Sequence, residues 1–271
     1  MEKTISILGC GWLGFPLALQ LIQGAYIIKG STRTYSKLEQ LEQNGIKPYL
    51  IELGDTEDYL IQDFLDASVL IINIPPSKAF TKEVSFFEIM NELKCQIEKS
   101  KIEKVILVSS TSVLGDREGE LDEETIPNPE TDRAKELYAV EQVFTENHSF
   151  DCSIVRFAGL IGPGRHPGRF LSGRIDVPGG NSRVNLIHLD DCIGIISKII
   201  DKDYWNEIIH AAAPIHPIKK DYYTEMSKRL GLTVPLFHPD GDVHDRIVVS
   251  SKIATKLDYS FKIENLIFSE D

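Results

Sequence analysis

Three glycines near the start of the sequence have the spacing of a loop that binds phosphate groups. Gly9, Gly11 and Gly14 form the pattern G-x-G-x-x-G. The first permits a tight turn, the second lets a pyrophosphate approach the backbone, and the third lets a helix pack closely on a strand. The start of that helix would offer unpaired N–H groups and the positive end of its dipole to the same phosphates. A tight glycine turn in any α/β protein is the alternative.

The elements on either side of these glycines favour nucleotide binding. The β-branched run Thr4–Leu8 predicts a buried strand before the loop, and apolar residues at helical spacing predict a helix after it. A second apolar run, residues 26–28, follows a stop at Gly24. Strand, glycine loop, helix and strand make one βαβ unit, which is the context in which the motif indicates a dinucleotide. The candidates for cofactor binding in this loop are Gly9, Gly11, Trp12, Leu13 and Gly14.

The residues after the second strand favour NADP over NAD. An NAD site has an Asp or Glu about 20 residues after the first glycine, where it binds the ribose 2′-OH. Residues 28–34 contain no carboxylate. Ser31, Thr32 and Arg33 would instead suit a 2′-phosphate, which arginine can bind through two N–H groups, and Lys37 adds charge. The alternatives are a solvated basic loop and NAD as the cofactor.

Further cofactor contacts are expected where later strands end. Asp55 follows the strand predicted over residues 48–53, and it would either bond the adenine amine or serve as an ordinary turn residue. The apolar run 68–74 predicts a central strand that two prolines terminate, so the chain turns outward beside the glycine loop. Ile74 and Pro75 are therefore candidates for cofactor binding.

Hydroxyl groups follow the fifth predicted strand, residues 104–109. Ser110 and Thr111 come directly after it, where a parallel strand presents its carboxyl end, and they could hold a substrate carbonyl or hydroxyl. The acidic segment 116–124 that comes next is expected to be a solvated surface loop. A helix is predicted over residues 131–147.

A later loop, residues 159–180, is rich in glycine, proline and arginine. Long loops on an α/β scaffold commonly cover a pocket. Arginines in and after it stand out in an acidic protein, and they would either bind an anionic substrate or cofactor phosphate or neutralise nearby carboxylates. These arginines are Arg165, Arg169, Arg174 and Arg183.

Composition excludes several classes of partner. The 271 residues carry a net charge of −12, which argues against nucleic acid and against an anionic membrane. No apolar run approaches about 18 residues, so we expect no membrane span. The first residues lead directly into the first strand, so we expect neither signal nor transit peptide. The four cysteines form no CxxC pair and the histidines no metal-binding spacing, which predicts a cytoplasmic protein with reduced thiols and no metal.

Four segments, in order, resemble the extended short-chain dehydrogenase/reductase family, the group of sugar-nucleotide epimerases and dehydratases. They are residues 9–14, 108–115, 156–165 and 185–191, and the resemblance covers nearly the whole chain. It implies an α/β fold with a doubly wound parallel sheet of the Rossmann type and a small C-terminal substrate lobe. The expected NADP-binding domain is residues 1–160, with its sheet completed by residues 183–213. The expected substrate lobe is residues 161–182 and 214–271.

The same resemblance implies a catalytic pair that this chain lacks. In the family, a Tyr acts as acid and base, and a Lys four residues later lowers the pKa of the Tyr. If Glu141 matches the Glu that follows this pair in the family, Arg133 stands at the Tyr position and Leu137 at the Lys position. Tyr138 and Lys135 are nearby, but they lie about 100° and about 160° around the helix from Leu137. The chain therefore resembles the atypical members of the family.

Three hypotheses follow. The first is an NADP-dependent oxidoreductase or epimerase-like enzyme that acts on a small anionic molecule. Ser110 matches the family's substrate-orienting serine, so Ser110 and Thr111 would bind the reacting oxygen, with Arg133 as an electrostatic stabiliser. The second is a catalytically silent NADP(H) sensor, and the third is a scaffold that has lost the nucleotide. The helices at 82–100 and from Thr131 correspond to those that often form a two-fold homodimer in the family, although packing within one subunit explains the same residues.

Overall fold

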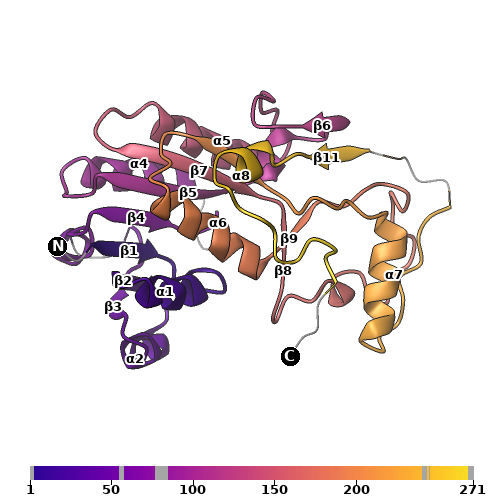
Figure 1. Ribbon diagram of the computed structural model, residues 1–271, viewed down its shortest axis with the longest axis horizontal. Helices are drawn as coiled ribbons and strands as arrows, with labels where there is room; N and C mark the ends of the chain where they lie inside the picture. Colours follow the sequence, from indigo (N-terminus) through magenta and orange to yellow (C-terminus); the bar gives the residue numbers. More distant parts are fainter. Residues whose placement is uncertain (1–2, 55–57, 77–84, 240–242, 244, 268–271) are drawn as a thin grey trace. The chain divides into compact units, whose positions relative to one another are not determined.

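The computed structural model describes residues 3–54, 58–76, 85–239, 243 and 245–267. Within them, a parallel sheet of seven strands runs in the order β10-β7-β5-β4-β1-β2-β3 (Figure 1). Strand β1 pairs with β2 on one side and with β4 on the other, so the strand order reverses there. This doubly wound arrangement confirms the predicted fold class, and it puts the end of β1 at the point where such sheets bind ligands. The strands are β1 (Thr4–Leu8), β2 (Ile27–Thr32), β3 (Lys47–Leu50), β4 (Val69–Ile72), β5 (Lys104–Ser110), β7 (Asp151–Phe157) and β10 (Ile208–Ala211).

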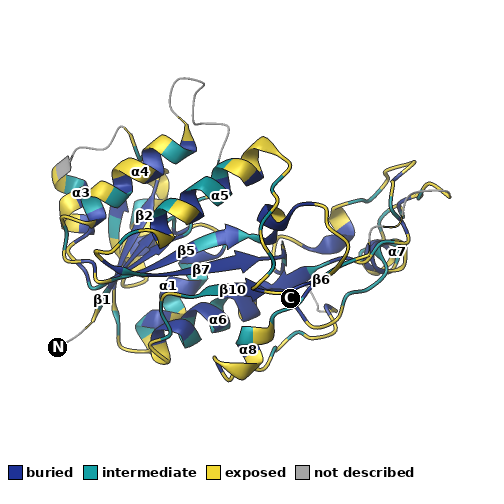
Figure 2. Ribbon diagram, turned by 90° about the horizontal axis from the view of Figure 1, so that it is seen from above, coloured by how far each residue is buried: buried dark blue, intermediate teal, exposed yellow. Residues whose placement is uncertain are grey.

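The middle strands are apolar because both faces of the sheet are covered. Ile5, Leu70 and Ile106 are completely buried, as expected for parallel strands between two layers of helices. Figure 2 shows α3, α4 and α5 on one face of the sheet and α1 on the other, with the exposed residues of these helices turned outward. The helices that begin in this part of the chain are α1 (Gly14–Gln23), α2 (Leu38–Gln43), α3 (Asp58–Phe64), α4 (Phe86–Ile97) and α5 (Asp132–Thr145).

Helices α4 and α5 each begin at a residue whose side chain caps the N-terminus of the helix. The Ser85 hydroxyl accepts a hydrogen bond from the Glu88 N–H, and the Glu88 carboxylate accepts one from the Ser85 N–H, which makes a capping box for α4. Thr131 caps α5 in the same position with its hydroxyl oxygen. The two helices pack together, and Glu136 on α5 accepts the N–H of Phe86 at 2.8 Å.

The apolar residues of α4 are buried within this chain. Packing inside one subunit therefore explains these residues, and they are no evidence for the predicted homodimer, which stays a prediction. Residues 82–84, which the sequence adds to this helix, lie outside the described part of the chain. The buried residues of α4 are Phe86, Ile89, Met90, Leu93 and Ile97.

Residue contacts divide the chain into two compact units. The first comprises Met1–Ser110, Thr131–Val155 and Ile196–Ile208. The second comprises Thr111–Glu130, Arg156–Ile195 and Ile209–Asp271. The predicted domain boundaries, and the role of residues 161–182 and 214–271 as a substrate lobe, stay predictions.

The second unit contains two small parallel sheets. In one, β6 (Gly119–Leu121) pairs with β11 (Arg246–Val248), and in the other, β8 (Gly159–Ile161) pairs with β9 (Leu186–His188). Strand β9 thus belongs to a two-stranded sheet and not to the seven-stranded one. The unit also contains α7 (Lys219–Arg229) and α8 (Ser251–Thr255), while α6 (Leu189–Asp201) runs across the boundary between the units.

The prediction that segment 116–124 is a solvated loop holds for most of its residues but not for all of them. Residues 116–120, 122 and 124 are exposed, but Gly119–Leu121 form β6, and Glu123 is only 8% exposed. Burial of this carboxylate is compensated because its oxygens accept hydrogen bonds from the Ser251 hydroxyl at 2.5 Å and the Lys252 N–H at 3.3 Å. Acidic composition predicted solvent exposure, but these donors come from a segment more than a hundred residues away, so the local sequence could not reveal them.

A buried aspartate holds the C-terminal segment. Asp191 has no exposed surface, and one of its oxygens accepts from the Tyr259 hydroxyl at 2.8 Å and from the Lys262 N–H at 2.7 Å. The other oxygen accepts from the Ile263 N–H at 3.2 Å. Gly194 makes room for the ring of Tyr259, because a Cβ there would lie 2.3 Å from the Tyr259 oxygen. These hydrogen bonds therefore anchor the C-terminal segment to the second unit.

None of the helices in the described ranges combines the length and the apolar character that crossing a membrane requires.

Candidate functional site

The loop between β1 and α1 requires two of its three glycines for internal reasons. Gly9 has a φ of +102°, a conformation that favours glycine, and a Cβ there would lie 2.6 Å from the Asn73 carbonyl oxygen. A Cβ on Gly14 would lie 2.2 Å from the Gly9 carbonyl oxygen. These two glycines therefore let the loop turn tightly and let α1 pack against it.

Gly11 needs a different explanation. It is exposed, and a Cβ on it would meet no protein atom within 4 Å. The helix that follows begins without a side-chain cap and without an acidic residue in its first turn, so the first N–H groups of α1 face no competing anion there. An open approach to the backbone beside an uncapped helix N-terminus suits a pyrophosphate. The residues of the loop thus fit the phosphates of a dinucleotide.

Side chains from β2 and β4 hold this loop in place. The Ser31 hydroxyl accepts a hydrogen bond from the Gly9 N–H at 2.9 Å, and the Ser31 carbonyl accepts one from the Cys10 N–H at 2.8 Å. Asn73, just after β4, donates from its amide to the Gly9 carbonyl at 3.1 Å. Sequence analysis missed Asn73, although an amide within the otherwise apolar run 68–74 was a usable signal. Ser31, predicted to face the cofactor, is buried, and its hydroxyl and carbonyl oxygens hold the loop.

The end of β2 presents basic groups. Thr32 is buried, and its hydroxyl accepts the N–H of Thr34 at 3.1 Å, while Arg33 and Lys37 are exposed. Within the described ranges, neither Arg33 nor Lys37 forms a hydrogen bond or an ion pair with the protein. These two cations are therefore available to an external anion.

The other predicted cofactor residues surround the loop or fall outside the described residues. Trp12 and Ile74 are half-buried, Leu13 is buried and Pro75 is exposed. The methyl group of Ile74 reaches to 3.0 Å from the position of a Gly9 Cβ. Asp55 lies outside the part of the chain that is described. Their contacts with a cofactor stay predictions.

The residues at the end of β5, and Thr111 directly after it, are positioned by hydrogen bonds. Ser109 donates from its hydroxyl to the carboxylate of Glu141, which is buried on the inner face of α5. Ser110 is half-buried at the end of the strand. Thr111 is buried, and its carbonyl accepts a hydrogen bond from the guanidinium of Arg246. A buried carboxylate on α5 thus fixes the end of the strand that carries the candidate serine.

Helix α5 presents different faces at the two positions predicted to match the family's catalytic pair. Arg133 is exposed, and no ion pair involving it is recorded among the described residues. Leu137 is 6% exposed and faces the interior together with Glu141. Tyr138 is half-buried. Apolar packing therefore surrounds Leu137, the residue predicted to match the family's lysine.

The predicted arginines have different environments. Arg183 forms an ion pair with Asp245 at 3.2 Å and donates to the His216 carbonyl at 2.9 Å, so it neutralises a carboxylate. Arg174 is exposed, and Arg169 ends a short turn that packs against α7. These contacts favour the structural alternative for Arg183 and leave the alternatives for the others open.

His188 occupies a structural position. Its Nδ1 accepts the N–H of Asp190 at 3.2 Å, and burial lowers the pKa of the imidazole against the opposing charge of Asp190 and Asp191. Across the described ranges, no group of three or more His, Cys, Asp or Glu side chains is arranged to hold a metal ion.

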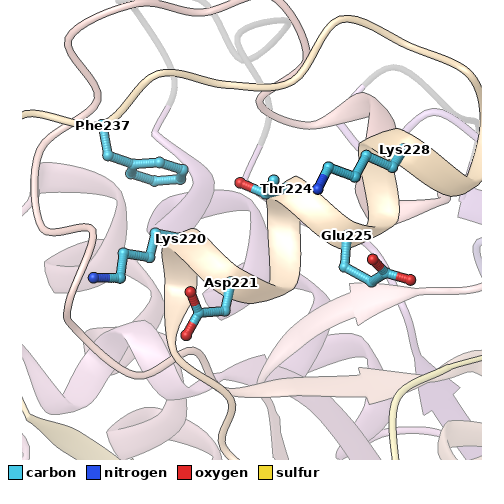
Figure 3. Close-up of a pocket in the computed structure, with 6 residues that line it drawn as sticks. All are labelled: Lys220, Asp221, Thr224, Glu225, Lys228 and Phe237. Atoms are coloured by element: carbon cyan, nitrogen blue, oxygen red, sulfur yellow. The ribbon is translucent and has the colours of Figure 1, made fainter.

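A shallow hollow of about 390 Å³ lies beside α7 in the second unit (Figure 3). The ring of Phe237 comes from a loop opposite the helix, and charged side chains of both signs line the helix side. Acidic and basic groups alternate there, so the hollow favours neither an anion nor a cation. None of the predicted site residues lies in it. Its lining residues are Lys220, Asp221, Thr224, Glu225, Lys228 and Phe237.

Comparisons with known proteins agree with this geometry. UDP-glucuronic acid 4-epimerase from Bacillus cereus, solved in complex with NAD, matches with a TM-score of 0.81 and 20% identity over 96% of this chain and 94% of that chain. UDP-glucose 4-epimerase from Thermotoga maritima, solved with UDP-glucose, matches with a TM-score of 0.80 and 18% identity over 97% of this chain and 96% of that chain. No family model matches the chain. The fold is that of the epimerase and dehydratase type of NAD-binding protein.

The chain belongs to the family of protein YeeZ, and it shares its fold with these epimerases and with a short-chain dehydrogenase/reductase superfamily protein from Agrobacterium tumefaciens. Its relative in Escherichia coli (strain K12) is protein YeeZ, which is 33% identical over 266 residues, or 96% of each chain.

Proposed function

We propose that this chain binds a nicotinamide dinucleotide through the β1–α1 loop. The observation that carries the proposal is the open space at Gly11, because no atom of the described residues lies within 4 Å of the position that a Cβ would take there. Gly9 and Gly14 shape the loop, and the uncapped start of α1 supplies N–H groups for the pyrophosphate. The scaffold hypothesis, in which the nucleotide site has been lost, gains no support from this open approach.

The cofactor in this proposal is NADP(H), and NAD is the alternative. Arg33 and Lys37 are exposed cations that no described carboxylate pairs, so a 2′-phosphate can take both of them without breaking an existing contact. The Bacillus cereus epimerase was solved with NAD, so NAD(H) must be tested beside NADP(H).

The activity in this proposal is that of an NADP-dependent oxidoreductase or epimerase-like enzyme on a small anionic substrate. A bound nicotinamide would supply or accept a hydride. Ser110 and Thr111 would hold the reacting oxygen by hydrogen bonds, and Arg133 would stabilise negative charge that develops there. Arg133 cannot shuttle a proton, because a guanidinium stays protonated. Both epimerases above act on or bind UDP-sugars, so sugar nucleotides are the first substrates to test.

One observation favours a second candidate, a catalytically silent NADP(H) sensor. Leu137, which we predict to match the family's lysine, is packed into the interior. A helix with apolar packing there keeps its fold but has no group to lower the pKa of a neighbouring proton donor. Nucleotide binding without turnover would be the result.

The test measures cofactor affinity first and turnover second. Calorimetric titration of the full chain with NADPH and NADH should give tighter binding of NADPH. Arg33→Ala should weaken NADPH by about tenfold, equivalent to about 1.4 kcal/mol, and leave NADH unchanged. Glu39→Ala, which removes an exposed charge from the neighbouring helix, is the control for nonspecific charge effects.

Turnover then separates the two candidates. Consumption of NADPH with carbonyl compounds, or interconversion of sugar nucleotides, supports an enzyme, and tight binding with neither supports a sensor. Absence of binding by both dinucleotides would overturn the proposal.

A further inference from the structure

One peptide unit of the β1–α1 loop, between Gly9 and Cys10, has both of its polar groups bonded to neighbouring segments of the sheet. The Cys10 N–H donates to the Ser31 carbonyl of β2 at 2.8 Å. The Gly9 carbonyl oxygen accepts a hydrogen bond at 3.1 Å from the side-chain amide of Asn73, the residue that directly follows β4. The two ends of this peptide dipole are therefore held from opposite sides.

The N–H groups that come next in the loop are not used by the protein. Within the described ranges, the N–H groups of Gly11 and Leu13 donate no hydrogen bond, and α1 begins without a side-chain cap. Free N–H groups at a helix N-terminus attract anions, whereas a carbonyl oxygen repels them through its partial negative charge. An unpaired Gly9 carbonyl, two residues before Gly11, would therefore weaken the anion site that these groups form.

Asn73 is fixed beside this carbonyl by its surroundings. Its N–H donates to the Leu8 carbonyl at 2.9 Å, which continues the pairing of β4 with β1. Its carbonyl oxygen lies 2.6 Å from the position that a Gly9 Cβ would take, and its side-chain nitrogen lies 3.1 Å from that of a Gly14 Cβ. The two glycines that shape the loop thus also make room for Asn73.

We propose that Asn73 is a positioning residue for the pyrophosphate of the dinucleotide. Its amide binds the Gly9 carbonyl and so neutralises the negative end of this peptide beside the free N–H groups of the loop. A carboxylate of the same shape would do the reverse, because it would repel both the carbonyl oxygen and the phosphates. This inference rests on the proposed function, since it assigns a role in binding the same dinucleotide.

The test titrates ADP-ribose, which carries the pyrophosphate but no nicotinamide, calorimetrically into the full chain. Asn73→Leu and Asn73→Asp both keep the shape of the side chain, and only the second adds a negative charge. At pH 7.5, Asn73→Leu should weaken binding by about fivefold, because the Gly9 carbonyl loses its donor, and Asn73→Asp by at least about thirtyfold.

The matched control is Asn44→Asp. Asn44 is exposed at the end of α2, and its amide also donates to a backbone carbonyl, that of Gln40 at 2.8 Å. The control makes the same change in charge and removes the same kind of hydrogen bond at a residue outside the loop. It should therefore leave the affinity for ADP-ribose within about twofold of that of the unmodified chain.

A pH profile separates this role from simple packing. A protonated aspartic acid can donate to a carbonyl oxygen, and the carbonyl and the bound anion both raise the pKa of the carboxyl group that Asn73→Asp introduces. Relative to the unmodified chain, Asn73→Asp should therefore regain affinity for ADP-ribose by at least about fivefold as the pH falls from about 8 to about 5.5. Asn73→Leu has no group to protonate and should show no such recovery.

Several outcomes would overturn the inference. They are equal affinities of Asn73→Leu and Asn73→Asp at pH 7.5, no recovery of Asn73→Asp in acid, and binding of NADPH without binding of ADP-ribose. If Asn73→Asp fails to fold, Asn73→Leu decides, and an affinity equal to that of the unmodified chain would refute the role. Failure of the unmodified chain to bind ADP-ribose, NADPH and NADH would instead contradict the proposed function.

Discussion

The Ser31 hydroxyl accepts the Gly9 N–H at 2.9 Å and so ties the end of β2 to the first glycine of the β1–α1 loop. The bond joins a residue of β2 to the residue that directly follows the neighbouring strand β1, and Gly9 has a positive φ there. Sequence analysis assigned Ser31 to the 2′-phosphate, but its hydroxyl holds the β1–α1 loop in shape. Substitution of Ser31 should therefore change nucleotide affinity differently from substitution of Arg33.

Ser31→Ala should weaken NADPH and NADH by the same factor, about fivefold to tenfold. The change leaves the Gly9 N–H without its acceptor, which costs about 1–1.4 kcal/mol of loop stability in the bound form. Isothermal titration with both nucleotides measures the two affinities. Selective loss of NADPH alone would contradict this role, and it would mean that the Ser31 hydroxyl contacts the 2′-phosphate directly.

Gly11→Ala and Gly14→Ala should separate binding from folding. The new methyl group at residue 11 meets no protein atom within 4 Å, so unfolding stability should stay within about 0.5 kcal/mol while nucleotide affinity falls by about tenfold. At residue 14 it would lie 2.2 Å from the Gly9 carbonyl, which should destabilise the protein by about 1–3 kcal/mol. Urea unfolding and NADPH titration of both variants measure the two effects. An unchanged affinity in Gly11→Ala would sink the assignment of the loop.

Asp191→Asn should destabilise the protein by about 3 kcal/mol. The carboxylate accepts hydrogen bonds from the Tyr259 hydroxyl and from two backbone N–H groups of the C-terminal segment, and an amide cannot accept at both of its atoms. Burial, together with the charge of Asp191, also raises the pKa of Tyr259, so this hydroxyl remains a donor at neutral pH. Chemical denaturation measures the loss. Asp190→Asn, at the exposed neighbouring carboxylate, is the control and should change stability by less than about 0.5 kcal/mol.

Stability should fall in mild acid because of His210. Its ring lies between the Arg156 guanidinium and the Leu121 carbonyl, each at 3.3 Å, and since arginine only donates and a carbonyl only accepts, the ring is neutral with its proton on Nδ1. Burial, and then the charge of Arg156, lower the pKa of His210 to about 4, against the opposing effect of Glu123 and Asp122. The unfolded chain takes up this proton near pH 6.5, so the stabilisation is complete above that pH and is lost as pH falls towards about 4.

The measurement for His210 is urea unfolding at several pH values. Between pH 6.5 and 4, His210→Gln should show a shallower decline than the unmodified chain, by up to about 1.4 kcal/mol for each pH unit. His238→Gln, at an exposed histidine, should retain the full decline. Parallel curves for the His210 variant and the unmodified chain would mean that other groups govern the acid response.

Sequence alone determined the fold and the position of the nucleotide loop. Alternating runs of buried strand and amphipathic helix are local patterns, and the G-x-G-x-x-G spacing at the first strand–helix turn depends on backbone sterics within six residues. For the same reason the lack of a Tyr and Lys pair on the helix after Thr131 could be read directly, since residues four apart share a helix face.

Tertiary structure alone decided which residues support that loop and which charges remain unpaired. The pairing of Ser31 with Gly9 and of Asn73 with the same glycine depends on the order of strands in the sheet, which brings together residues 22 and 64 positions apart. The two hydrogen bonds between the Asn185 side chain and β11 likewise join residues more than sixty positions apart. No local pattern encodes such contacts, because burial and hydrogen bonding are set by whatever the rest of the chain packs against each group.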